Sequence, residues 1–197
     1  MARRTFFSFH YKPDVSRAWI VRNSWMTKQD RDAAGFFDSS VFESKDREST
    51  EVLKRFLREG LSNTSVTCVL VGSETALRRW VRYEIFQSFI RGNGLLAVRI
   101  HGIADLNKQT SNAGADPFGS LAFTIDGDRL QFKEYMANGW QLARDVPSMP
   151  LTDVAYNLGT LTNHSMNHLF PIYDYVAGSG YQNLPTWIDA AAAAAGR

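Results

Sequence analysis

A largely apolar segment from Ser65 to Val71 constrains the fold of this chain more than any other feature. More than half of its residues are β-branched, none is charged, and Gly72 and Ser73 follow it directly. An uninterrupted run of this kind is typical of a central parallel strand that is covered on both faces. The segment therefore predicts a layered α/β domain with helices on both sides of a sheet.

Strands and helices alternate through the first half of the chain. We expect strands over residues 4–11, 35–38, 65–71 and 95–103. Helices are expected at 14–25, 50–61 and 73–91, where the apolar residues recur at helical spacing or stop signals follow. Asp14 and Ser73 are the candidate N-caps. This alternation predicts a mostly parallel central sheet with right-handed crossovers.

The second half of the chain is less regular. A long polar loop covers residues 104–120, and a hairpin is expected over 121–133 around an Asp-Gly-Asp turn. A final helix should begin at Leu184 and run into the alanine tract. We expect one domain over residues 1–197, with a core of about 1–105 and a C-terminal extension of about 106–197 that carries the hairpin and helices.

The bulk composition narrows the classes of partner. A formal net charge of +2 is too small to argue for nucleic acid, and no apolar run approaches the length of a membrane span. Cys68 is the only cysteine, which excludes an intrachain disulfide. Without a signal-peptide pattern at the N-terminus, we expect a cytoplasmic protein. His164 and His168 lie four apart, but no third ligand stands nearby, so no metal site is expected.

Glu84 lies where its helix should be apolar. On a helical wheel with Leu77 at zero, Glu84 falls on the same side as Ile85. An ionised carboxylate on that face is costly unless a partner or a cavity compensates it. Two interpretations stay open, a buried pair with an arginine of a neighbouring helix and a catalytic group. Arg82 and His10 are the candidates for holding the carboxylate ionised.

Polar and aromatic side chains gather where the expected strands end. In parallel α/β sheets, ligands bind at the carboxyl ends of the strands. We expect ligand contacts at these ends, and the residues expected there are Ser8, Phe9, His10, Tyr11, Asp38 and Ser39. Asp38 fits capping of a loop as well.

Three segments, in order, resemble a TIR domain. Residues 4–11 are similar to the first TIR strand, which ends in a Ser-Phe pair, and residues 35–38 are similar to the second. Residues 69–85 resemble the third strand and the Trp-x-x-x-Glu helix that follows it. Within the TIR group, residues 8–11 and 20–25 are most similar to the ThsB-type proteins of bacterial Thoeris antiphage defence.

The resemblance implies a flavodoxin-like TIR fold and an NAD-consuming enzyme with Glu84 as its catalytic residue. It also implies substrate contacts by Arg17, which matches the arginine of the first TIR helix, and by the aromatic Trp80 and Tyr83, although Trp80 fits core packing as well. Such an enzyme cleaves the bond between nicotinamide and ribose and forms a cyclic ADP-ribose isomer, which activates a separate effector protein. A phage-derived trigger and a homo-oligomer are also implied. No glycine-rich phosphate fingerprint follows the first strand, so NAD is expected as substrate and no further cofactor is expected.

Two other functions remain open. The first is a non-catalytic TIR module that acts by protein–protein association, which does not need a carboxylate on that helix face. The second is a nucleotide-binding module of flavodoxin or receiver type. A receiver needs a phosphorylatable aspartate on the third strand, and residues 69–73 offer none.

Overall fold

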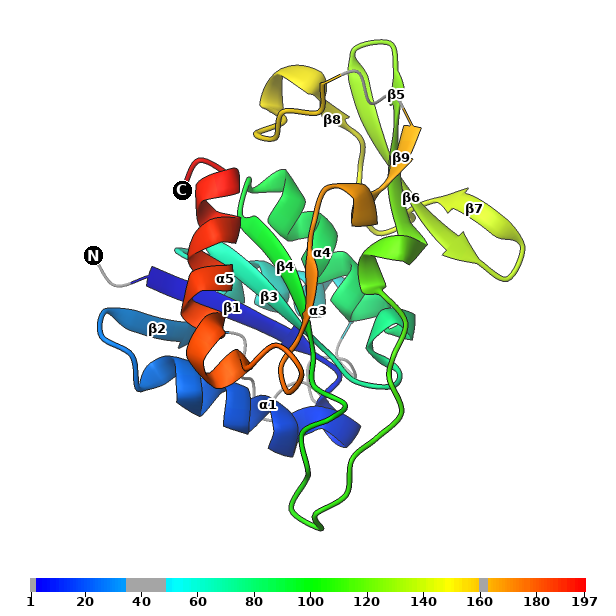
Figure 1. Cartoon of the computed structure of the whole chain (residues 1–197). Coiled ribbons are helices and arrows are strands. Elements are labelled where there is room, and N and C mark those ends of the chain that lie inside the picture. The colour runs from blue at the N-terminus through cyan, green and yellow to red at the C-terminus, as the bar shows by residue number, and fades with distance from the viewer. Residues whose placement is uncertain (1–2, 35–48, 160–162) are drawn as a thin grey trace.

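The computed structural model describes residues 3–34, 49–159 and 163–197. Its central sheet has five parallel strands in the order β10-β4-β3-β1-β2. The sheet and its surrounding helices are visible in Figure 1. The strands of this sheet are β1 (Arg3–Phe9), β2 (Arg31–Ala34), β3 (Val66–Val71), β4 (Gly94–Arg99) and β10 (Ile172–Asp174).

Helices cover both faces of the sheet. Helices α1 (Tyr11–Met26) and α5 (Gly180–Ala194) pack on one face, and α3 (Thr50–Gly60) and α4 (Arg79–Ile90) pack on the other. The alternation along β3 shows how the sequence builds both layers. Cys68 and Leu70 belong to the core beneath α1 and α5, whereas Val69 and Val71 belong to the core beneath α3 and α4.

The predicted α/β architecture is confirmed. Every residue of β3 is buried, as an apolar strand between two helical layers requires. The expected alternation of strands and helices is present in the described part of the first half. The short fifth strand β10, which lies beside β4, was not expected, because its three residues are too few to set a period.

The extension forms a second, antiparallel sheet in the order β7-β6-β5-β9, with β8 paired to β6. Its strands are β5 (Leu121–Asp126), β6 (Arg129–Met136), β7 (Gly139–Leu142), β8 (Met149–Pro150) and β9 (Asn163–Ser165). The hairpin of β5 and β6 confirms the expected turn. Phe132 of β6 packs against Phe86 of α4 with ring centroids 5.0 Å apart. Helix α4 therefore lies between the two sheets.

Four short 3-10 helices complete the described elements: η1 (Thr75–Leu77), η2 (Pro117–Ser120), η3 (Leu151–Asp153) and η4 (Met166–His168). The expected helix from Ser73 is wrong at its start, because α4 begins at Arg79 after η1. Leu77 lies outside α4 and is 70% exposed. The Asp14 cap is also wrong, since α1 begins at Tyr11 and Asp14 lies inside its first turn.

The alanine tract is part of a packed helix. Helix α5 begins four residues before Leu184 and includes the tract, in which Ala191 and Ala192 are buried. Gly94 at the start of β4 permits this approach, because a Cβ there would lie 2.4 Å from the Ala191 carbonyl oxygen. No helix among the described residues has the length and apolar character that crossing a membrane requires.

Candidate active site

Glu84 lies in the middle of α4, and its carboxylate points at the end of β1. The Ser8 hydroxyl donates a hydrogen bond to Glu84 Oε2. Glu84 is only 7% exposed. Burial raises the pKa of Glu84 to about 8, and the hydrogen bond from Ser8 opposes that rise. Both protonation states of this carboxyl group are therefore accessible near neutral pH.

Among the residues that the structure describes, no arginine, lysine or histidine forms an ion pair with Glu84. Arg82 lies instead 4.0 Å from Glu134 of the extension, and His10 Nδ1 lies 3.8 Å from Glu74. The expectation that Arg82 or His10 holds the carboxylate ionised is therefore wrong. The alternative interpretation, in which Glu84 pairs with an arginine of a neighbouring helix, finds no such arginine among the described residues.

The orientation of α4 follows from a second polar residue one turn further along. Ser88 lies on the same face as Glu84, because positions four apart align on a helix. The Ser88 and Thr67 hydroxyls are 2.7 Å apart, and Ser88 also donates to the Glu84 carbonyl oxygen at 2.7 Å. The hydroxyls of two strand residues, Ser8 on β1 and Thr67 on β3, thus contact the polar side chains on this face of α4.

The predicted site residues at the end of β1 point in different directions. Ser8 faces α4, whereas Phe9 packs against the core beneath α1 and α5. The rings of Phe9 and Tyr11 stack with centroids 6.0 Å apart. Burial, and then the charge of Arg78, lowers the pKa of His10. Of these four residues the structure joins only Ser8 to Glu84, and substrate contact by the others stays a prediction.

A second buried carboxylate, Asp14, lies on the end of β3. A Cβ at Gly72 would lie 2.1 Å from the Asp14 carboxylate oxygens, so a larger residue there would displace the Asp14 carboxylate. Thr75 Oγ1 donates to Asp14 at 3.4 Å and accepts from the Gly72 amide at 2.9 Å. Burial raises the pKa of Asp14 to about 6, although Arg17 acts to lower it. Asp14 therefore ties α1 to the turn after β3.

Arg17 is held by the loop after β4. Its buried guanidinium donates to four oxygens: Ile103 O at 2.9 Å, Pro13 O at 3.0 Å, Gln109 O at 2.8 Å and Asp105 Oδ2 at 3.3 Å. These bonds give Arg17 a structural role as the anchor of residues 103–109. A contact between Arg17 and substrate stays a prediction.

The same loop lies across the carboxyl edge of the sheet. Gly114 approaches Gly72 so closely that a Cβ at Gly114 would lie 1.9 Å from the Gly72 carbonyl oxygen. Arg99 donates to the Gly114 carbonyl, and the Ser111 amide donates to the His101 carbonyl at 3.0 Å. The long loop is therefore an ordered cover over the ends of β3 and β4.

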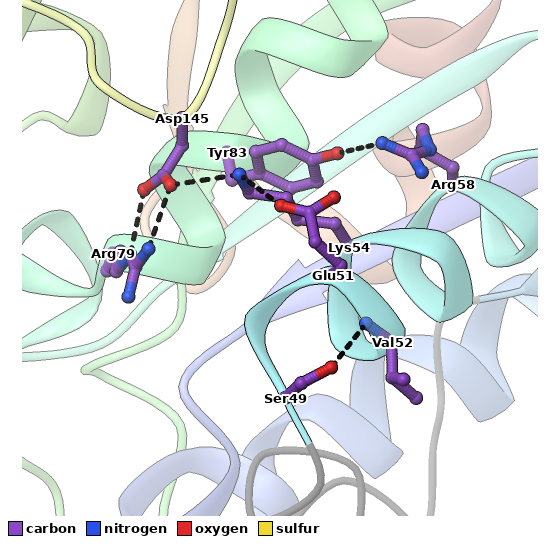
Figure 2. Close-up of polar contacts among 8 residues, drawn as sticks. All are labelled: Ser49, Glu51, Val52, Lys54, Arg58, Arg79, Tyr83 and Asp145. Atoms are coloured by element: carbon purple, nitrogen blue, oxygen red, sulfur yellow. Dashed lines mark hydrogen bonds and ion pairs between the residues drawn. The ribbon is translucent and has the colours of Figure 1, made fainter.

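Trp80 and Tyr83 serve the packing of α4. Trp80 is half-buried against the core beneath α3 and α4, and its ring meets that of Tyr83 edge to face at 6.0 Å. Tyr83 is fully buried, and its hydroxyl accepts a hydrogen bond from Arg58 of α3 at 3.0 Å, as Figure 2 shows. Their contact with substrate stays a prediction, beside the packing role that the structure gives them.

An ion-pair network joins the extension to the helices of the core (Figure 2). Asp145 accepts two hydrogen bonds from Arg79, at 2.7 and 2.8 Å, and lies 3.2 Å from Lys54 Nζ. Lys54 also pairs with Glu51 at 3.1 Å. The hydrogen bonds from Arg79 are the main cause of the lowered pKa of Asp145. Sequence reasoning missed Asp145, because the segment around it has no secondary-structure period.

Several predictions of site residues receive no structural account. The strand expected over 35–38, with Asp38 and Ser39 after it, lies outside the described residues.

The rings of His164 and His168 meet edge to face at 5.5 Å. No group of three or more histidine, cysteine, aspartate or glutamate residues in the described ranges has the arrangement of a metal site.

A cavity of about 370 Å³ lies at the opposite edge of the sheet, at the starts of β4 and β10. Its lining carries no charged side chain and consists of Leu95, Tyr156, Asn157, Leu169, Phe170, Pro171, Tyr173, Ala190, Ala191 and Ala194. Ligands of parallel sheets bind at the carboxyl edge, so this cavity lies at the edge opposite to the expected site of chemistry.

Comparison with known proteins agrees with this geometry. Residues 6–105 match the family described as "Thoeris protein ThsB, TIR-like domain". Over 192 residues, the chain is 38% identical to a protein of Bacillus cereus (strain MSX-D12) named "Putative cyclic ADP-D-ribose synthase ThsB1". That alignment covers 96% of this chain and 100% of the relative. The similarity thus includes the extension as well as the core.

Proposed function

This chain belongs to the ThsB family of TIR-like Thoeris proteins, and from that premise we propose that it is an NAD-consuming cyclic ADP-ribose synthase. It breaks the bond between nicotinamide and ribose and closes the remaining ADP-ribose into a ring. The relative's name supports the reaction, and the buried Glu84 supports the site. NAD is the substrate, and the chemistry needs no further cofactor.

The single observation that carries the proposal is a buried carboxylate without a cationic partner among the described residues. A protein gains nothing in stability from such a group, because ionising it away from water is costly. A substrate that brings positive charge changes this balance. The nicotinamide ring of NAD is a cation, and a cation close to Glu84 would favour its ionised form.

The proposed reaction moves this positive charge within the substrate. The glycosidic bond breaks with its electron pair leaving on the nicotinamide nitrogen, so nicotinamide departs neutral. Positive charge then spreads over ribose C1 and the ring oxygen, as in glycoside hydrolysis. The Glu84 carboxylate stabilises that charge, and it does so strongly because its surroundings hold little water. A hydroxyl of the adenosine ribose then bonds to C1 and releases its proton, which closes the ring.

We also propose the wider setting that the family resemblance implies. The cyclic product acts as a second messenger on a separate effector protein in antiphage defence. A phage-derived component triggers synthesis. The resting enzyme is then weakly active, so the assay must include an activated state.

The test compares matched glutamate variants of the full chain. Cells that express the wild type, Glu84→Gln or Glu59→Gln are challenged with phage, and their extracts are analysed by chromatography for nicotinamide and cyclic ADP-ribose isomers. Glu59 is an exposed residue of α3 and serves as the control. We expect Glu84→Gln to lower product formation roughly 10²–10³-fold. Absence of product from the wild type in every state would refute the enzyme, and a fully active Glu84→Gln would refute the site.

A further inference from the structure

Strand β7 forms one edge of the antiparallel sheet in the extension. The sheet runs β7-β6-β5-β9, and among the described residues β7 pairs with β6 alone. Figure 1 shows the β6–β7 hairpin projecting away from the central sheet and its helices. The outer edge of β7 is therefore accessible to another strand.

Strand β7 carries no charged residue, and its exposed side chains are apolar. Trp140 and Leu142 of β7 are 45% and 58% exposed, and Tyr135 of β6 is 54% exposed. Tyr135 lies directly opposite Trp140, and their rings meet edge to face at 5.4 Å. The four residues of β7 include no charge and no proline. Proteins usually protect exposed edge strands with such residues, so an unprotected one is a candidate docking surface.

The hydrogen-bond pattern fixes which main-chain groups face the open edge. The Ala143 amide donates to the Phe132 carbonyl at 2.9 Å, so these two residues form a hydrogen-bonded pair of the β6–β7 ladder. Hydrogen-bonded and non-hydrogen-bonded pairs alternate along an antiparallel ladder. Trp140 and Leu142 therefore belong to non-hydrogen-bonded pairs, and their amide and carbonyl groups point outward.

We propose that a second copy of this chain docks here, with β7 pairing antiparallel to the β7 of its partner about a twofold axis at Gln141. In that register Trp140 of each copy lies opposite Leu142 of the other. The outward-facing groups of these two residues match, so four main-chain hydrogen bonds form. The apolar side chains of both residues meet on the outer face, and the two copies of Gln141 meet on the inner face. The pattern is self-complementary, as a twofold interface requires.

The size of the surface sets the strength of this dimer. About half of Tyr135, Trp140 and Leu142 is exposed, which corresponds to roughly 300 Å² of apolar surface per copy. Two such surfaces bury less than the roughly 1,200–2,000 Å² of a stable interface. We therefore expect a weak dimer whose population rises with protein concentration.

Sedimentation velocity of the full chain over a range of concentrations tests the pairing. We expect a monomer–dimer equilibrium for the wild type and at least tenfold weaker association for Leu142→Glu. Lys133 lies opposite Leu142 and can pair with the new carboxylate, so the variant should fold. Leu106→Glu is the control, because Leu106 is 91% exposed in the loop after β4. A wild type that stays monomeric at every concentration would overturn the pairing, as would equal association by Leu142→Glu.

Oxidative cross-linking tests the register independently. In the proposed dimer the two copies of Gln141 form a non-hydrogen-bonded pair with Cα atoms about 4.5 Å apart, which suits a disulfide. The native Cys68 is buried and leaves the background low. We expect Gln141→Cys to form a disulfide dimer much faster than Asn138→Cys in the turn of the same hairpin. Equal rates for the two variants would overturn the register.

Discussion

The hydroxyl of Ser8 donates a hydrogen bond to the carboxylate of Glu84 across 76 positions of the sequence. This bond joins Ser8, near the carboxyl end of β1, to Glu84 in the middle of α4. It also opposes the effect of burial on the carboxylate, because a donor favours the ionised form. The protonation state of Glu84 is thus set by burial, by Ser8 and, in the proposed function, by bound NAD.

The first prediction concerns the pH dependence of NAD cleavage. The ionised carboxylate is the active form, and the pKa of Glu84 in the free enzyme is about 8. We expect kcat/KM to rise with pH through a midpoint near 8 and to level off at about pH 9. The midpoint for kcat should lie at lower pH, because the cationic ring of bound NAD favours the carboxylate. Rates measured between pH 6 and 9.5 in the activated state test this, and a flat kcat/KM profile would contradict it.

The second prediction concerns Ser8→Ala. Loss of the hydroxyl removes a hydrogen bond to the ionised form, so the midpoint of the pH profile should move upward. Activity at pH 7 should fall roughly three- to tenfold, and part of the loss should be recovered at pH 9. Ser88→Ala is the control, since it removes a hydroxyl from the same helix face and leaves the Ser8–Glu84 bond in place. The same midpoint in both variants would argue against the role of Ser8.

The third prediction concerns the stability of Glu84→Gln. The pKa of Glu84 is raised in the folded state, so the folded protein resists ionisation of this group. The wild type therefore loses stability relative to the variant as pH rises from about 4.5 to about 8. Below that range the two proteins should unfold alike. Above it we expect Glu84→Gln to be more stable by on the order of 5 kcal/mol, since each pKa unit corresponds to roughly 1.4 kcal/mol. Urea unfolding at pH 5 and pH 9 measures the difference, and an equal gain at both would contradict the linkage.

The fourth prediction concerns the network that attaches the extension. Asp145→Asn removes the charge that pairs with Arg79 and Lys54 (Figure 2). Because these groups are partly exposed, we expect a loss of only about 1 kcal/mol in the free energy of unfolding. The loss should shrink at high salt. Asp128→Asn, at an exposed turn of the β5–β6 hairpin, is the control. A loss that is independent of salt would point to packing and not to ion pairing.

The sequence alone predicts the layers of the core correctly, but it does not predict which elements surround α4. The apolar run of β3 and the period of α3 predict burial directly, since they record which faces are covered. Helix α4 is buried nearly all round, because the hairpin of the extension covers the side that Arg82 occupies. Nothing in residues 79–90 reveals this second layer. The prediction that Arg82 could hold the Glu84 carboxylate ionised was therefore wrong, whereas the burial of Glu84 was correctly expected.

The last prediction concerns the cover over the carboxyl edge. Gly114→Ala places a Cβ against the Gly72 carbonyl oxygen, at 1.9 Å without movement, so the loop must shift away from the ends of β3 and β4. Arg17 holds the near end of that loop through residues 103–109, so the strain should open the segment locally and leave the sheet folded. We expect hydrogen exchange to accelerate at least tenfold for amides of residues 110–116 and to stay unchanged in β3. Gly119→Ala is the matched control, because its Cβ would meet nothing closer than 3.8 Å. Unchanged exchange in Gly114→Ala would mean that this loop does not depend on its contact with Gly72.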